Sequence, residues 1–196
     1  MIASAKIEDG AMAKNKPQVT FDDQLILFRF FLNELGIDGM DVLSKKLNSI
    51  DYEGVNESGN TYFFEYISRM CRMKSAAISE DKLRMYDENI CRHTRQISEK
   101  RGSIKWKYFQ YVSLLFTEMY LDRYFSDKDA FCKELNDFLA EKDMETLYAL
   151  GYAPYTTDKM NKLAFMCATG SGKTLIMHVN ILQFLNYFRK AKRINS

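Results

Sequence analysis

The sequence predicts a mainly α-helical fold in which an N-terminal helical bundle is followed by the beginning of an α/β domain. Three observations lead to this prediction. The 196 residues include only 9 glycines and 2 prolines, too few for many short strands and tight turns. Hydrophobic residues make up 46% of the chain and recur three or four positions apart over much of residues 20–150, as on the inner faces of helices. Near the C-terminal end, a short apolar run is followed by a glycine-rich turn and an apolar helix.

The chain divides into three expected parts. These are a flexible arm at residues 1–19, a helical accessory domain at residues 20–151, and the truncated start of an α/β domain at residues 152–196. The arm lacks any hydrophobic period, whereas Thr20 can cap a helix that Gly36 ends. The accessory domain therefore begins at Thr20.

The remaining helices of the bundle follow in order from the spacing of apolar residues. They are expected at residues 41–47, from Tyr62, from Glu80 to Gly102, at 104–125, from Ser126, and at 143–150. The segment 104–125 is the most apolar and predicts the central helix, with Trp106, Phe109 and Phe116 in the core. Ser126, with Asp129 three residues later, resembles a helix cap. His93 has no cysteine or histidine at metal-ligand spacing and is expected on the surface.

A different pattern begins at Tyr152. Residues 162–167 predict a short buried strand, and residues 172–188 predict an apolar helix. The turn between them is close to the phosphate-binding pattern G-x-x-x-x-G-K-[ST]. Its predicted nucleotide-binding residues are Thr169, Gly170, Ser171, Gly172, Lys173 and Thr174. The glycines let backbone N–H groups approach phosphate oxygens, Lys173 would reach the β- and γ-phosphates, and the Thr174 hydroxyl would bind Mg²⁺.

The run from Met166 to Thr174 resembles motif I of superfamily 2 DEAD/DEAH-box helicases and translocases. Within that group it is most similar to the ATPase subunits of type III and type I restriction enzymes. Cys167 stands at the first glycine of the strict pattern, a position that this superfamily relaxes. The resemblance covers about residues 160–190 and implies a RecA-like domain that binds ATP and Mg²⁺. Tyr152 and Tyr155 are candidates to stack on the base.

The resemblance also implies parts that residues 175–196 do not supply. Hydrolysis in these families needs a Walker B Asp-Glu pair and arginines from a second domain. No acidic residue follows Asp158, so no catalytic residue is predicted here. We therefore expect an N-terminal fragment of an ATP-dependent DNA helicase or translocase, inactive by itself although the whole protein is an enzyme.

The expected setting is the cytoplasm, because residues 1–17 lack the apolar stretch of a signal peptide, no segment is apolar enough to span a membrane, and the four widely spaced cysteines are expected to be reduced thiols. The resemblance implies DNA as a partner of the intact protein, with a methyltransferase or another restriction or defence subunit as a further candidate. A second hypothesis is a stand-alone helical interaction module that carries a relic phosphate loop. In either case, exposed apolar residues of the last helix make dimerisation through that helix a candidate.

Overall fold

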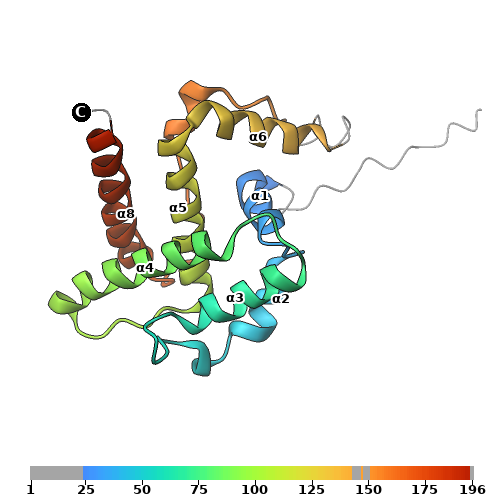
Figure 1. Ribbon diagram of the computed structural model, residues 1–196. Coiled ribbons are helices and arrows are strands. Elements are labelled where there is room, and N and C mark those ends of the chain that lie inside the picture. The colour runs from blue at the N-terminus through green and yellow to red at the C-terminus, as the bar shows by residue number, and fades with distance from the viewer. Residues whose placement is uncertain (1–23, 143–146, 148–150, 195–196) are drawn as a thin grey trace, which may run out of the picture.

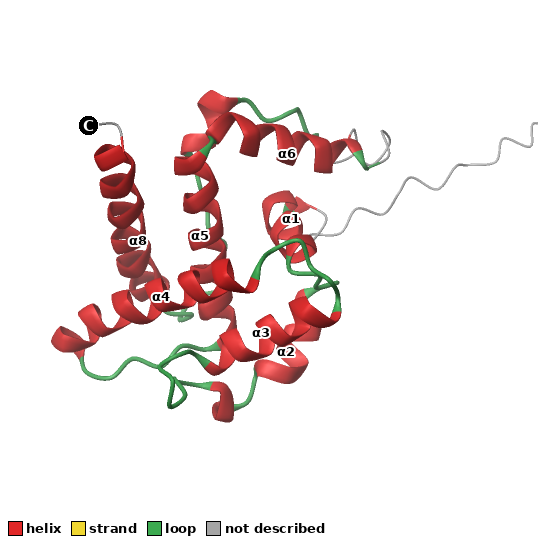
Figure 2. Cartoon of the chain, viewed as in Figure 1, coloured by secondary structure: helices red, strands yellow, loops and turns green. Residues whose placement is uncertain are grey.

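The computed structural model describes residues 24–142, 147 and 151–194, and in these residues the fold is mainly α-helical, as predicted (Figure 1, Figure 2). The helices are α1 (Ile26–Glu34), α2 (Met40–Leu47), α3 (Tyr62–Met73), α4 (Glu80–Arg101), α5 (Tyr108–Ser126), α6 (Lys128–Ala140) and α8 (Lys173–Ile194). Two 3₁₀ turns, η2 (Ile50–Tyr52) and η3 (Thr157–Asn161), join them. The predicted arm, the Thr20 cap and most of the predicted helix at 143–150 lie outside the described residues.

Helix α5 is the centre of the fold. All eight residues from Leu114 to Leu121 are buried, so every side of this helix is covered. Helix α8 stands beside α5 and runs in the same direction, while α4 crosses both, and α6 lies across the far end of α5 (Figure 1). Ile176, Val179 and Tyr187 of α8 belong to the same hydrophobic core as the preceding helices. None of the helices whose bounds are described is long and apolar enough to cross a membrane.

Side-chain caps fix where several helices begin. The Thr61 hydroxyl accepts a hydrogen bond from the Phe64 N–H at 3.0 Å, and the Ser79 hydroxyl accepts one from the Lys82 N–H at 3.3 Å. The predicted cap at Ser126 is wrong, because α5 continues through Ser126. Asp127 is the first residue outside α5, and its carboxylate accepts from the Ala130 N–H at 2.9 Å.

The central helix also begins later than predicted. Residues 104–107 are not helical, and Trp106 is buried in this connection, where its indole N–H donates to the Thr94 hydroxyl at 2.8 Å. Phe109, expected in the core, is 37% exposed. Helix α8 runs six residues beyond the predicted end, since the basic residues of its last turns favour a helix C-terminus.

A buried carboxylate joins three helices. Asp87 of α4 is fully buried and accepts hydrogen bonds from the Thr61 N–H at 2.9 Å, the Thr61 hydroxyl at 2.6 Å and the Tyr111 hydroxyl at 2.7 Å. Burial raises the pKa of Asp87, while these donors lower it. Asp87 therefore ties the start of α3 and the side of α5 to α4.

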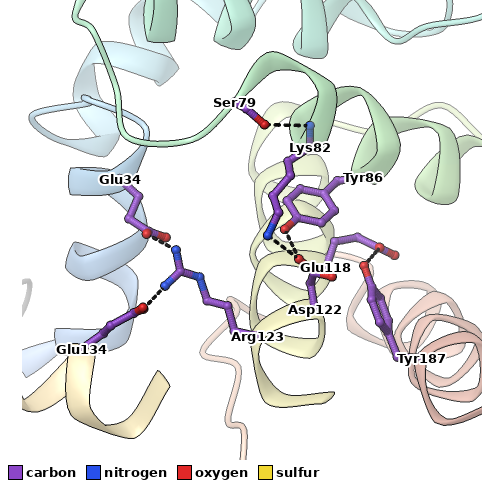
Figure 3. A network of polar contacts seen from close by, with 9 residues as sticks. All are labelled: Glu34, Ser79, Lys82, Tyr86, Glu118, Asp122, Arg123, Glu134 and Tyr187. Atoms are coloured by element: carbon purple, nitrogen blue, oxygen red, sulfur yellow. Dashed lines mark hydrogen bonds and ion pairs between the residues drawn. The ribbon is translucent and has the colours of Figure 1, made fainter. Parts of the chain in front are cut away.

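Arg123 of α5 makes a second polar link, shown in Figure 3. Its guanidinium pairs with Glu34 of α1 and with Glu134 of α6, and it lies over the rings of Phe30 and Phe131 at 5.3 and 5.7 Å. Burial raises the pKa of Glu34 to about 6, although Arg123 acts in the opposite direction. One cation therefore links α1 to α6, in addition to the ring contacts of Phe30 and Phe31 with Phe131.

Two tyrosines complete the network in Figure 3. The Tyr86 hydroxyl donates to Asp122 at 2.8 Å, and the Tyr187 hydroxyl of α8 donates to Glu118 at 2.8 Å. Glu118 is fully buried and also accepts from the Asn89 side chain at 2.8 Å. Helix α8 is therefore held on α5 by polar bonds as well as by apolar packing.

His93 lies in the interior, so its predicted surface position is wrong. Its side chain is 5% exposed, and neither ring nitrogen has a hydrogen-bond partner within the described part of the chain. Burial, together with the charges of Arg92 and Lys190, lowers the pKa of His93 to about 4. Lys190 belongs to α8, and the spacing of apolar residues in α4 does not indicate that α8 lies near His93.

We expect His93→Leu to be at least as stable as the wild type at pH 7. Its free energy of unfolding should rise relative to that of the wild type as the pH falls. The unfolded chain protonates this histidine near pH 6.5 but the folded chain only near pH 4, so acid favours unfolding of the wild type. Urea unfolding at pH 7 and pH 4.5 should show the difference in unfolding free energy between the two proteins growing by about 2 kcal/mol. An equal difference at both pH values would contradict this expectation.

Candidate functional site

The segment before the candidate phosphate loop, residues 162–167, starts with an extended Lys162 backbone and lies outside any helix or ladder. The predicted strand at residues 162–167 is wrong for this chain, because the structure forms no ladder within its described residues. A strand needs a neighbour to pair its N–H and C=O groups, and the isolated bridge between Val55 and Thr61 lies elsewhere in the fold. Leu163 packs partly against the core, whereas Phe165 and Met166 are exposed.

The six predicted nucleotide-binding residues follow in one turn that leads into α8. Gly170 has φ +79° and Gly172 has φ +82°, the left-handed region that glycine enters without strain. A Cβ at Gly172 would also lie 2.6 Å from Nε2 of Gln110. The backbone conformation at residue 172 therefore favours glycine, and a Cβ there would displace the side-chain amide of Gln110.

Lys173 folds back over this turn. Its Nζ donates to the carbonyl oxygens of Cys167 at 3.1 Å and Ala168 at 3.0 Å. The ammonium group therefore lies across the loop while its side chain stays exposed to solvent. Because Lys173 and Thr174 open α8, their N–H groups have no carbonyl four residues back within the helix, and the positive end of the helix dipole faces the loop.

Gln110 of α5 holds the loop in place, a role that the sequence analysis missed. Its Nε2 donates to the carbonyl oxygen of Ser171 at 2.8 Å, and its Oε1 accepts from the Lys107 N–H at 2.9 Å. Gln110 lies in the first turn of an apolar helix, where a glutamine side chain can accept a hydrogen bond from the backbone N–H at the start of the helix. That pattern predicts the bond to Lys107 but not the contact 61 residues away.

A cavity of about 680 Å³ opens beside the loop. It lies between α1, α5 and residues 162–167, and Cys167, Ala168 and Ser171 line both the cavity and the loop. The rest of its wall is mostly aliphatic and aromatic, and the aromatic residues include Phe28, Phe109, Phe116, Tyr155 and Phe165. Tyr152 also lines it, and its hydroxyl donates to the Gln24 carbonyl.

The chemistry of the loop fits a polyphosphate anion better than a bare metal ion. Glycines, helix N–H groups and a lysine are donors that match phosphate oxygens. No group of three or more His, Cys, Asp or Glu side chains that could hold a metal was found among the described residues. The exposed Thr174 hydroxyl is an oxygen ligand of the kind that Mg²⁺ accepts together with the oxygens of a bound nucleotide.

Comparison with known proteins found no matching family model, no matching curated protein and no matching solved structure.

Proposed function

We propose that this chain supplies the phosphate-binding loop of an ATP-dependent DNA helicase or translocase of the restriction-enzyme type. The observation that carries the proposal is the loop geometry: two left-handed glycines, Lys173 folded over loop carbonyls, and the start of a 22-residue helix follow in one turn. Together these features form a cradle for phosphate oxygens. The resemblance of the run from Met166 to Thr174 to motif I supports the motor class.

Two further features support this proposal. Residues 162–167 have no partner strand within the described chain, and α8 exposes Met177, Ile181, Phe184 and Phe188 along its outer side. In a RecA-like domain, residues 162–167 would pair with neighbouring strands of a parallel sheet, and the sheet would cover the exposed apolar side of α8. Under the proposal Lys173 neutralises the β- and γ-phosphates, Thr174 completes the Mg²⁺ shell, and hydrolysis depends on carboxylates and arginines outside residues 1–196.

We expect MgATP to bind this chain and Lys173→Ala to weaken binding at least roughly tenfold, because one charge-assisted contact to phosphate is lost. Isothermal titration calorimetry measures both affinities. Lys46→Ala, which removes an exposed lysine on α2, is the matched control and should leave the affinity unchanged. Equal affinities for the wild type and Lys173→Ala would exclude the loop as the binding site.

The second candidate function is a helical interaction module whose phosphate loop is a relic. The exposed apolar line on α8 favours it. No acidic residue follows Asp158, so pairing two copies of α8 would bring basic residues together. A protein with an apolar ridge and an acidic rim is therefore a better partner for this helix than a second copy of the chain. Absence of MgATP binding in the wild type would favour this function.

A further inference from the structure

We propose that the cavity beside the phosphate loop binds the base and ribose of a nucleoside triphosphate. This inference rests on the proposed phosphate-binding role of the loop. The cavity volume of about 680 Å³ lies within the range of about 300–1,000 Å³ typical of small-molecule sites. Its wall includes Cys167, Ala168 and Ser171, so a ligand whose phosphates lie on the loop has its remaining atoms next to this cavity.

The walls suit a planar aromatic group. Phe109 on α5 and Phe165 in residues 162–167 are 37% and 40% exposed, although both are large apolar rings that line the cavity. Phe28 and Tyr155 also line it and are partly buried. A base that stacks on such rings gains affinity whatever its hydrogen-bonding edge, and it removes exposed aromatic surface from water.

The charged side chains that line the cavity are basic. The only charged side chains among its described lining residues are Lys159 and Lys162, and none of these lining residues is a carboxylate. Ser171 also lines the cavity, through atoms other than its buried hydroxyl oxygen. The two lysines give the cavity a positive potential, which favours the approach of a ligand whose phosphates lie on the adjoining loop.

The base site is therefore built by the helical bundle, with α1 and α5 on one side and residues 162–167 on the other. The nucleotide would bridge the bundle and the start of α8. This assignment gives the helical part a direct role in nucleotide binding.

The test compares MgATP, magnesium tripolyphosphate and adenosine on the full chain by calorimetry. Ala164→Trp fills the cavity from an exposed position on its wall, and Ala153→Trp places the same ring at an exposed alanine that does not line it. We expect the wild type to bind MgATP at least roughly tenfold more tightly than tripolyphosphate, because stacking adds to phosphate binding. Ala164→Trp should lose this preference and keep its tripolyphosphate affinity, while Ala153→Trp keeps both.

Each other result is informative. Equal wild-type affinities for MgATP and tripolyphosphate, or an Ala164→Trp variant that keeps the preference, would overturn the base site while leaving the loop in place. Adenosine binding that Ala164→Trp abolishes, without any tripolyphosphate binding, would support the cavity and remove the proposed function of the loop. No binding of any of the three ligands would overturn both. Circular dichroism and the urea midpoint verify that each variant is folded.

Discussion

Asp87→Ala is expected to lower the free energy of unfolding by about 3 kcal/mol at pH 7. The substitution leaves three buried donors without an acceptor, namely the Thr61 N–H and the hydroxyls of Thr61 and Tyr111. Each such orphan costs about 1–3 kcal/mol, and the total is reduced because the wild-type carboxylate itself bears a burial penalty, as its raised pKa indicates. Urea unfolding followed by circular dichroism measures the change.

Glu88→Ala is the matched control for Asp87→Ala. Glu88 is the next residue of α4 and is exposed, so its removal should change stability by no more than about 0.5 kcal/mol. The stability loss of Asp87→Asn should lie between those of Glu88→Ala and Asp87→Ala, since an amide oxygen still accepts hydrogen bonds. If Asp87→Ala costs no more than the control, the carboxylate does not join α3 and α5 to α4 in the way described.

Arg123→Ala should cost about 3–4 kcal/mol at pH 7.5, because it leaves the carboxylate of Glu34 buried without its cation. The loss should shrink at pH 5. Burial already raises the pKa of Glu34 to about 6 in the wild type, and removing the cation raises it further, so at pH 5 the variant holds Glu34 in its neutral form. Proton uptake by the folded state stabilises it as the pH falls, which offsets part of the damage.

The test is urea unfolding at pH 5 and pH 7.5 of three proteins. These are the wild type, Arg123→Ala, and Arg123→Ala combined with Glu34→Gln. The second substitution replaces the unpaired charge by a neutral group of similar shape and should recover at least about 1 kcal/mol at pH 7.5. A loss that is the same at both pH values and is not recovered by Glu34→Gln would assign the effect to the contacts of Arg123 with Phe30 and Phe131.

The helical bundle could be predicted from the sequence because most of its helices are amphipathic and carry local start and stop signals. Thr61 and Ser79 are caps whose partners lie three residues away, and α1 and α4 end just before Gly36 and Gly102. Such short-range interactions can be inferred from spacing. The Ser126 prediction was wrong by one residue because the preceding helix competes for the same position.

The parts of the site that could not be predicted depend on contacts between distant segments. The bond from Gln110 to Ser171 and the burial of His93 beneath α8 leave no periodic signal in either segment. The unpaired state of residues 162–167 has a similar origin. An apolar run indicates that a strand can form, but a partner strand decides whether it does. The glycine-rich turn and the helix after it could be predicted from the local sequence, whereas the phosphate-binding role of the loop residues stays a prediction.

The bonds between α8 and α5 have a mechanical consequence. Apolar side chains tolerate sliding, but the hydrogen bonds of Gln183 to the Leu114 carbonyl at 3.0 Å and of Tyr187 to Glu118 tolerate only a few tenths of an ångström. These anchors lie ten and fourteen residues beyond Lys173, about 15–21 Å along the helix axis. Helix α8 is thus fixed to α5 near its middle, so a shift of the helix along its own axis would strain both of these hydrogen bonds.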